Sequence, residues 1–538
     1  MGIGDPVVRP WSVWANWRQI SRPDLAGRPK GNNKRPWPPR NTTRLVGLIS
    51  LVLAAALGLG HWAIPPTAAA PSPTPTSPAW RVGLDPTFPP FEFRDNKTGK
   101  ITGFDVELIQ AIGQEAGHPI DLVALPFDGL IPALQVKSID AAISAITITA
   151  QRARALDFSR PYFHAGQAIV MADQSPAITN LADLKGRRIA VQIGTTGAIA
   201  ASGVPGAKVT SFDSTPLALQ ELANGNADAV VSDIPAILYA IQQAHLKGLR
   251  ITGDNLSTEY YGIALPTRSP LTAELNQALQ TLINNGHYET LYRKWFANEP
   301  PQLPEVATAL KDKTSTLAGL DLSPLLSNLL KGAAITLLLT LLSFSFGLVG
   351  GSLLAMALQS PWPLAQRFCR IYIDFLRGTP MLVQLFLIYF GLPALLQSLE
   401  IPFSINRLAA AVTALSLNVA AYLAETLRSG IESIEPGQWE AADALGLSPL
   451  EQMRFVIAPQ AIRRVLPPLA NEFITLIKDT SLAAVIGVEE LFREGQLMVA
   501  TTYRAFEIYI AVALVYLVMT TSASLFFKQL ERKLKVPT

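Results

Sequence analysis

Stretches without charge dominate the C-terminal half of this 538-residue chain. Charged residues are absent between Lys331 and Arg367, Arg377 and Glu400, Arg407 and Glu425, and Glu507 and Lys528. Because a helix rises about 1.5 Å per residue and a bilayer core is about 30 Å thick, each stretch can hold a membrane span. A fifth apolar stretch, 465–488, contains Glu472, Lys478 and Asp479, which we expect to face protein or a cavity, since facing lipid would be costly. The sequence therefore predicts five spans.

The distribution of cations tests this topology. If the segment before the five spans lies outside the cell, the predicted inner segments hold eleven Lys and Arg residues and the outer loops hold three. This asymmetry satisfies the positive-inside rule. Apolar residues make up 49% of the chain and charged residues 16%, which excludes a disordered chain and disfavours an ordinary soluble enzyme. A Lys478–Asp479 pair inside a span is either functional or a structural ion pair.

The N-terminal region divides into three segments. Residues 1–44 carry nine Lys or Arg and two Asp without helical or strand periodicity, so we expect a basic, disordered cytoplasmic tail. Residues 45–64 form an apolar segment, which is either an uncleaved transmembrane anchor, the reading we favour, or a secretory signal with a cleavage site near Ala68–Ala70. Residues 65–78 form a Pro-rich linker. Both readings place the following domain outside the cytoplasm.

Residues 79–299 have a composition closer to that of a soluble protein. Short β-branched runs alternate with helical segments, and this alternation predicts an α/β fold. The expected strands are Arg81–Leu84, Ile120–Ala124, Arg188–Gln192 and Ala229–Val231, and the expected helices are Phe104–Ala116, Leu130–Val136, Pro216–Ala223 and Leu271–Asn285. A second linker, 300–327, precedes a membrane domain that we assign to 328–535.

Five segments of this domain occur in a distinctive order. They are Asp85–Phe93, Gly103–Asp105, Phe127–Leu134, Thr147–Arg152 and Asp157–Tyr162. Together they resemble the polar amino-acid-binding proteins of bacterial ABC importers. The resemblance implies a periplasmic-binding-protein-like fold, with two α/β lobes that close over one ligand. Lobe one would comprise about 80–165 and 255–300, and lobe two about 166–254.

The resemblance and the residue chemistry together suggest a ligand site. Arg152 offers a planar fork that pairs with a carboxylate, and Asp233 follows a buried run where a carboxylate is unexpected without a role. We expect Arg152 to bind the ligand carboxylate and Asp233 its ammonium group. Asp85, at the position that reads the distal group in the family, favours Arg, Lys, His or Gln over Glu or Asp. The candidate ligand-binding residues are Asp85, Phe88, Phe127, Ser144, Ala145, Thr147, Arg152, Gln192, Thr195, Thr196 and Asp233.

The other candidates have more limited roles. Phe88 and Phe127 match positions that sandwich the ligand's aliphatic stem in the family, and Gln192 would contact the ligand from the opposite lobe. Ser144 and Thr147 would add hydrogen-bond donors. The pair Thr195–Thr196 either closes on the ligand carboxylate through its amides or forms a plain turn and helix cap. Ala145 departs from the glycine or serine common among relatives.

A loop in the predicted cytoplasmic part of the membrane domain carries a second motif. Glu440-Ala-Ala-Asp-Ala-Leu-Gly446 is followed eleven residues later by Ile457-Ala-Pro459. The loop resembles the EAA loop of ABC-importer permeases, which implies a coupling helix that docks on an ATPase subunit. Gly446 would allow a turn between two helical pieces, and Pro459 would limit the preceding helix. The candidate coupling residues are Glu440, Ala441, Ala442, Gly446 and Pro459.

The sequence also indicates what the chain needs from partners. No GxxxxGK[ST] motif occurs, so we expect no cofactor in the chain and ATP hydrolysis by a separate ABC ATPase. One cysteine, Cys369, excludes a disulfide framework and CxxC zinc sites, and nothing suggests nucleic acid or a metal. We expect a multi-pass protein of the bacterial inner membrane that contacts lipid and pairs with itself or with a second permease, a homodimer being favoured. The alternatives are an amino-acid-gated channel, a sensor, or an enzyme on the same fold.

Overall fold

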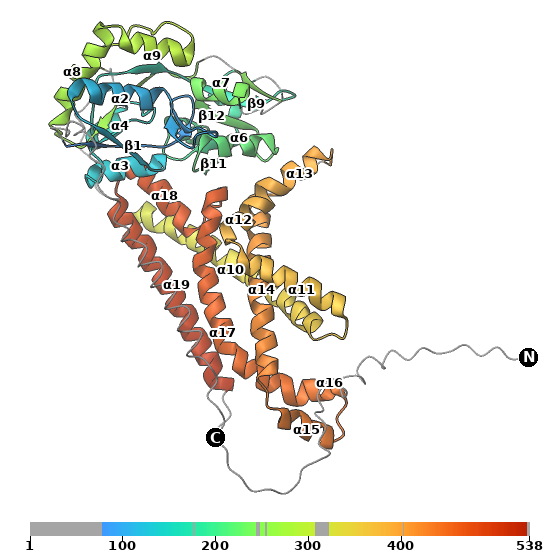
Figure 1. Ribbon diagram of the computed structural model, residues 1–538. Coiled ribbons are helices and arrows are strands. Elements are labelled where there is room, and N and C mark those ends of the chain that lie inside the picture. Colours follow the sequence, from blue (N-terminus) through green and yellow to red (C-terminus); the bar gives the residue numbers. More distant parts are fainter. Residues whose placement is uncertain are drawn as a thin grey trace, which may run out of the picture. The chain divides into compact units, whose positions relative to one another are not determined.

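The computed structural model describes residues 78–175, 178–243, 248–252, 255–306, 322–401 and 403–534 (Figure 1). The predicted basic tail, the apolar segment 45–64 and residues 65–77 of the Pro-rich linker lie outside these residues. The described part combines an α/β region with a helical region.

Lobe one is built on a five-stranded sheet with the order β5-β1-β6-β15-β7. Strand β1 is parallel to β5 and β6, whereas β15 is antiparallel to β6 and β7. The strands are β1 (Trp80–Leu84), β5 (Ile120–Ala124), β6 (Ala141–Ala142), β7 (Asp157–Phe158) and β15 (Ala264–Leu265). The helices are α2 (Phe104–Ala116), α3 (Phe127–Gln135), α4 (Ala150–Ala155), α8 (Leu271–Asn284) and α9 (His287–Phe296), and a small sheet joins β2 (Thr87–Phe88), β3 (Glu92–Arg94) and β4 (Ile101–Thr102).

Lobe two has its own five-stranded sheet with the order β11-β10-β12-β9-β13. Its strands are β9 (Gln167–Ala172), β10 (Arg188–Gln192), β11 (Lys208–Phe212), β12 (Ala229–Asp233) and β13 (Leu249–Thr252). Its helices are α5 (Thr196–Ser202), α6 (Thr215–Ala223) and α7 (Ile234–Gln243), with a 3-10 turn, η3 (Leu181–Leu184). The carboxyl ends of β10 and β12 carry Gln192 and Asp233, which places two predicted site residues at one edge of this sheet.

Two antiparallel strands connect the lobes. Strand β8 (Phe163–Ala165) pairs with β14 (Glu259–Tyr261), and an isolated bridge joins Thr147 to Tyr261. Strand β8 leads into β9 of lobe two, and β14 leads back into β15 of lobe one. The chain therefore crosses between the lobes twice, as the two-lobed fold class requires.

The predicted bounds of the helices and strands are close to the observed ones in both lobes, because the apolar periodicity and the turn residues mark the same boundaries. Helix α2 has the predicted bounds and ends at Gly117, which adopts φ 75° and donates its amide to the Gln114 carbonyl. Strands β5 and β10 also have the predicted bounds. Helix α3 begins three residues earlier than predicted, at Phe127, because Pro126 supplies the extended residue before its first turn.

The helical region comprises long and broken helices. They are α10 (Leu322–Leu358), α11 (Pro363–Gly378), α12 (Met381–Phe386), η5 (Leu387–Gly391), α13 (Leu392–Ser398), α14 (Arg407–Glu432), α15 (Pro436–Ala444), α16 (Pro449–Glu451), η6 (Gln452–Ile457), α17 (Ala458–Asp479), η7 (Thr480–Ile486), α18 (Leu491–Thr502) and α19 (Ala505–Leu534). Helix α10 begins inside the segment predicted as the linker 300–327.

By helix length and composition alone, fewer helices qualify as membrane spans than the five predicted from the sequence. Among the described residues, three helices qualify, 325–358, 407–432 and 505–533, or up to four if one bent pair counts as a span. That pair joins α11 to residues 381–396 and bends by 109° after Gly378, next to Pro380, whose ring disfavours a continuous helix. Helix α17 does not qualify, and it contains Glu472, Lys478 and Asp479.

Candidate functional site

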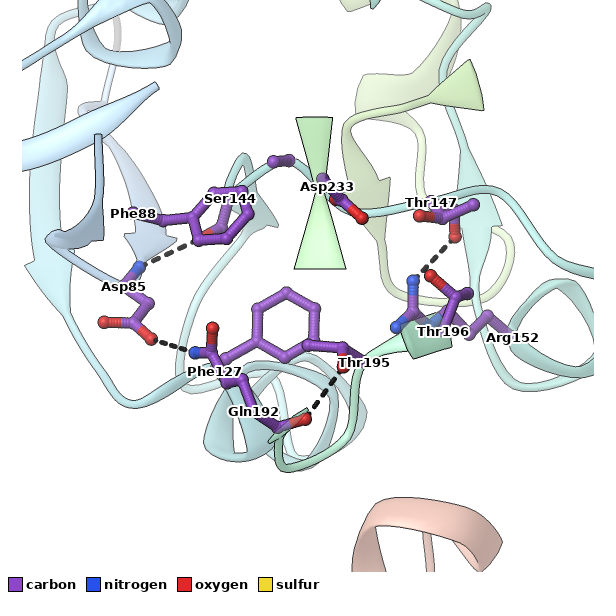
Figure 2. A pocket seen from close by; sticks show the side chains of 11 residues that line it. Asp85, Phe88, Phe127, Ser144, Thr147, Arg152, Gln192, Thr195, Thr196 and Asp233 are labelled. Carbon is purple, nitrogen blue, oxygen red and sulfur yellow. Dashed lines mark hydrogen bonds between the residues drawn. The ribbon is translucent and has the colours of Figure 1, made fainter. Parts of the chain in front are cut away.

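A pocket between the two lobes encloses about 310 Å³ of empty space, part of it open to solvent. The pocket is lined by the eleven predicted ligand-binding residues: Asp85, Phe88, Phe127, Ser144, Ala145, Thr147, Arg152, Gln192, Thr195, Thr196 and Asp233 (Figure 2). The structure brings all of them together, although they come from both lobes. Their individual roles toward a ligand remain predictions.

Arg152 is held rigidly in the wall of the pocket. It lies in α4, whose N-cap residue Thr149 accepts a hydrogen bond from the Arg152 amide at 3.1 Å. Its guanidinium donates to the carbonyl oxygens of Thr147 at 2.8 Å and Gly194 at 2.9 Å, and it lies 5.5 Å from the Phe127 ring centroid. The side chain is 1% exposed. Because an arginine has five N–H donors, others can still bind a carboxylate.

Two carboxylates lie near Arg152. Asp233, at the end of β12, accepts a hydrogen bond from the Tyr261 hydroxyl. Burial, and then the charge of the neighbouring Glu259, raise the pKa of Asp233 to about 7. A ligand ammonium would relieve this electrostatic cost, since an opposite charge favours the ionised carboxylate. The site can therefore accept both charges of a zwitterion.

Glu259 was not among the predicted site residues. It is buried in β14 and accepts hydrogen bonds from Thr147 Oγ1 at 2.6 Å and Thr196 Oγ1 at 3.0 Å. It thus ties lobe one to lobe two through two pocket threonines. No strand was predicted at Glu259–Tyr261, so no feature of the sequence marked this carboxylate as buried.

The other end of the pocket is formed around Asp85. This residue follows β1 and is 3% exposed, and its carboxylate accepts hydrogen bonds from Thr87 Oγ1 at 2.8 Å and Gln192 Nε2 at 3.0 Å. Gln192 belongs to lobe two, and its Oε1 accepts a bond from Thr215 at 2.8 Å. Burial raises the pKa of Asp85 to about 6. This end presents an anionic acceptor beside an amide.

A turn at Ser144 and Ala145 is anchored by two buried acids that sequence reasoning missed. Ser144 Oγ donates to Glu92 at 2.7 Å and accepts from the Asp85 amide at 3.0 Å, and the Ala145 amide donates to Asp105 at 2.9 Å. Ala145 adopts φ 46°, a region of backbone conformation that favours glycine. Burial raises the pKa of both Glu92 and Asp105.

The side chains of the threonine pair make different contacts. Thr195 is the N-cap of α5: its Oγ1 accepts from the Ala198 amide at 3.1 Å and donates to the Gln192 carbonyl at 2.8 Å. Its side chain therefore acts as a helix cap. Thr196 Oγ1 instead accepts from Gln167 at 2.7 Å. The rings of Phe88 and Phe127 turn toward the interior of the pocket (Figure 2).

The predicted coupling loop, which carries Glu440–Gly446 and Ile457–Pro459, forms a helical hairpin. Glu440 and Ala441 are exposed on α15, Ala442 is buried, and Gly446 turns the chain toward α16 with φ 72°. Gln452 fastens the hairpin through bonds to Asp443 at 2.6 Å and the Leu447 carbonyl at 2.8 Å. Glu440 and Ala441 therefore lie on the outer surface of the hairpin.

Pro459 does not end the preceding helix as predicted. It lies in the first turn of α17, directly after the π-helical segment η6. The wider π turn accommodates the missing amide of the proline, so the helix continues without a break.

Comparison with known proteins matches each region to a family. Residues 80–298 match the bacterial extracellular solute-binding proteins, family 3, and residues 347–536 match the binding-protein-dependent transport system inner membrane component. The chain is 44% identical over 214 residues to the glutamine transport system permease protein GlnP of Escherichia coli K12, covering 40% of this chain and 95% of GlnP. The chain is a fused binding protein and permease of an amino-acid ABC importer.

Other relatives match the binding domain of this importer subunit. A protein of Neisseria gonorrhoeae named "Probable histidine-binding protein" is 35% identical over 259 residues, which cover 47% of this chain and 94% of the relative. Among solved structures, the arginine-, lysine-, histidine-binding protein ArtJ from Geobacillus stearothermophilus shares 40% sequence identity with this chain. The match covers 41% of this chain and 96% of the ArtJ chain, with a TM-score of 0.40. No group of His, Cys, Asp and Glu side chains suited to a metal ion occurs in the described part of the subunit.

Proposed function

We propose that this importer subunit captures amino acids with a cationic or amide side chain, namely Arg, Lys, His or Gln, and transfers them to its own permease domain. The observation that carries the proposal is the buried Asp85 carboxylate, which faces Gln192 at the end of the pocket away from Arg152 and Asp233. Arg152 and Asp233 suit the carboxylate and ammonium groups that every amino acid shares. Asp85 and Gln192 suit a side chain that donates hydrogen bonds.

Side-chain charge gives this proposal its specificity. A guanidinium, ammonium or amide group can donate to Asp85, whereas a ligand carboxylate would meet a like charge and be repelled. The names of the relatives, a glutamine transport permease and a histidine-binding protein, agree with this class of ligand.

Binding by the full-length subunit in lipid nanodiscs tests the proposal. Isothermal titration with L-arginine, L-lysine, L-histidine and L-glutamine should give saturable heats, and L-glutamate and L-aspartate should bind at least about tenfold more weakly. Tighter binding of glutamate than of both arginine and glutamine would overturn the ligand class.

The subunit works with a separate ATPase, which docks on the hairpin around Glu440, and it holds no cofactor of its own. Two copies pair to complete the translocation path. ATP hydrolysis should therefore be undetectable in the purified subunit alone and appear when an ABC ATPase co-purifies with it. Light scattering of the detergent-solubilised subunit should give the mass of two copies. A monomeric mass would contradict the homodimer.

The binding domain lies on the outer face of the inner membrane, and the Glu440 hairpin lies in the cytoplasm. Protease added to intact spheroplasts should release the binding domain and spare the hairpin. Cleavage of the hairpin from outside would refute this orientation.

A further inference from the structure

Helix α18 of the permease domain contacts both lobes of the binding domain. Its first turn contacts lobe two through Arg493, and its end contacts lobe one through Thr501 and the following Tyr503. The two contact regions are separated along a single helix of 12 residues. A helix of this length keeps a fixed spacing between its ends.

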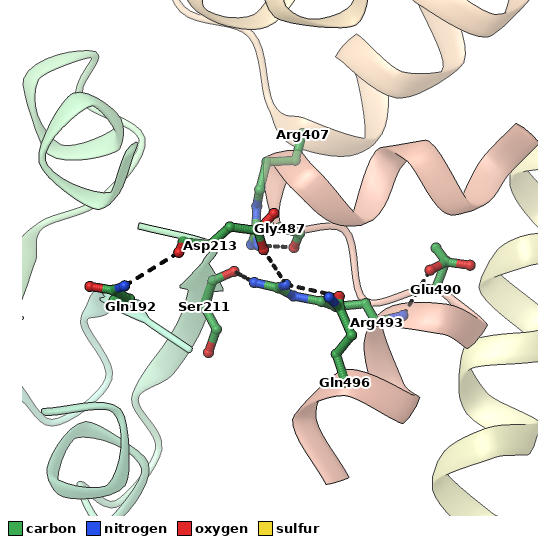
Figure 3. A network of polar contacts seen from close by, with 8 residues as sticks. All are labelled: Gln192, Ser211, Asp213, Arg407, Gly487, Glu490, Arg493 and Gln496. Carbon is green, nitrogen blue, oxygen red and sulfur yellow. Dashed lines mark hydrogen bonds and ion pairs between the residues drawn. The ribbon is translucent and has the colours of Figure 1, made fainter. Parts of the chain in front are cut away.

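The contact with lobe two is centred on a buried arginine. Arg493 is 1% exposed, and its guanidinium donates to Asp213 Oδ1 at 2.7 Å and to the Ser211 carbonyl (Figure 3). Gln496 accepts from the same guanidinium at 3.0 Å, and the buried Glu490 caps the helix by accepting from the Arg493 amide at 2.8 Å. Contacts within α18 therefore fix the position of Arg493, and its guanidinium binds lobe two at the end of β11.

This contact lies one residue from the ligand pocket. The carbonyl of Asp213 accepts from Gln192 Nε2 at 3.4 Å, and the same Nε2 donates to Asp85 at 3.0 Å. Gln192 is thus shared between Asp213, a bond that Figure 3 shows, and Asp85, the bond that joins the two lobes across the pocket. A shift of β11 away from Arg493 would move a residue that lines the pocket.

The contact with lobe one combines a hydrogen bond with packing. Gln151 Nε2 donates to the Thr501 carbonyl at 2.6 Å. Tyr503 joins a buried cluster of lobe one that includes Leu130 and Leu134. Gln151 also precedes Arg152, so this contact adjoins the pocket as well.

Both lobes and α18 meet at Gly194. A side chain added at Gly194 would start 3.7 Å from Ala500 Cβ and 3.7 Å from Asp128 Cα. Gly194 belongs to lobe two, Asp128 to lobe one and Ala500 to α18. The helix therefore packs against the place where the closed lobes touch.

We propose that α18 detects lobe closure, with Arg493 as the positioning residue that binds lobe two only while Thr501 and Tyr503 hold lobe one. The proposal rests on the proposed function, because it assumes that closure accompanies amino-acid binding. Opening rotates one lobe relative to the other about the strands β8 and β14, so a helix of fixed length cannot keep both contacts. Docking on the permease and ligand capture then stabilise each other by the same factor.

A titration of the full-length subunit in nanodiscs tests this coupling, with L-arginine and L-glutamine as probes. Arg493→Gln and Asp213→Asn should each weaken the binding of both amino acids by about fivefold or more, the usual lower range of coupling between sites. The matched control is Arg188→Gln, which breaks the ion pair of Arg188 with Asp228, 2.6 Å long, elsewhere on lobe two, and should leave both affinities unchanged.

A distance measurement distinguishes loss of the contact between lobe two and the permease from misfolding of the variants. Spin labels at the exposed positions Lys208 and Phe506, in a Cys369→Ser background, report the separation of lobe two from the permease. The distribution of distances between the two labels should be narrow in the parent protein and broad in Arg493→Gln. The double variant Arg493→Asp/Asp213→Arg, which exchanges the two charges, should restore the narrow distribution.

The outcomes separate the two proposals. Failure of the parent protein to bind either probe would refute the proposed function, and the spin-label distances would still test docking by Arg493. Binding by the parent protein with unchanged affinity and distance in Arg493→Gln would overturn the closure mechanism alone. A loss confined to arginine would also overturn it, since closure affects every ligand.

Discussion

Asp85 offers a sharp test of how the pocket selects its ligand. Replacing it by asparagine keeps the size of the side chain and removes the charge that would bind a cationic ligand. A hydrogen bond to a charged group contributes about 1.5–3 kcal/mol and a neutral one about 0.5–1.5 kcal/mol, so the loss is about 1–2 kcal/mol. The Asp85→Asn variant should therefore bind L-arginine about 5- to 30-fold more weakly.

Acidification should reproduce the effect of the mutation in the parent protein. The pKa of Asp85 is raised to about 6 by burial, so the carboxylate is ionised at pH 7.5 and gains a proton as the pH falls through 6. At pH 5 about one pocket in eleven is ionised, and affinity that depends on the charge falls about tenfold. Asp85→Asn should lack this part of the pH dependence.

The assay is the ratio of the dissociation constants for L-arginine and L-glutamine in the full-length subunit, measured by calorimetry between pH 5 and 7.5. Both amino acids share the same zwitterion, so protonation of Asp233 affects both and largely cancels in the ratio. Asp121→Asn, at an exposed aspartate in β5 of lobe one, is the matched control and should behave as the parent protein does. An unchanged ratio in Asp85→Asn, at every pH, would refute the assigned role.

Three further predictions follow from the site and the hairpin. Arg152→Gln should weaken binding of every amino acid by about 30-fold or more, because losing one partner of a buried charge pair costs about 2–5 kcal/mol; equal affinity in titration would contradict its role. Without ligand, the melting temperature of the binding domain should fall as the pH rises from about 4 to 7, because Asp233 (pKa about 7) and Asp105 (pKa about 6) bind more protons in the folded than in the unfolded protein. Calorimetry of the Asp233→Asn variant should show a smaller fall. Glu440→Arg should abolish co-purification of the ATPase but leave amino-acid affinity unchanged, whereas Glu115→Arg, on the exposed surface of α2, should affect neither; retained ATPase would argue against docking at the hairpin.

The lobes could be predicted from sequence because local signals and the overall fold agree there. Alternating apolar runs and turn glycines such as Gly117 define elements like α2 within a residue. The eleven pocket residues could be gathered only through the resemblance, since Asp85 and Gln192 are 107 positions apart in the chain and touch across two lobes. Periodicity carries no information on such contacts.

The remaining features depend on tertiary contacts that have no local signature. Glu259 and Asp105 cannot be distinguished from exposed acidic residues in the sequence, and only the three-dimensional packing shows that they are buried against pocket residues. The bend after Gly378 was missed because the spacing of charged residues gives the length of an apolar segment but not the direction of its helix. The contact of Arg493 with lobe two could not be predicted because its partner Asp213 lies 280 positions away in the sequence.

The π-helical segment η6 has a mechanical consequence for the hairpin that carries Glu440. A π turn holds one residue more than an α turn, and each residue of an α-helix advances the chain by about 100°. Deleting a single residue from Gln452–Ile457 would therefore restore regular winding and keep the hairpin at about the same angle around the axis of α17, whereas a deletion within the regular part of α17 would turn the hairpin by about 100°. The π turn thus lets the chain carry one surplus residue while the hairpin keeps its direction.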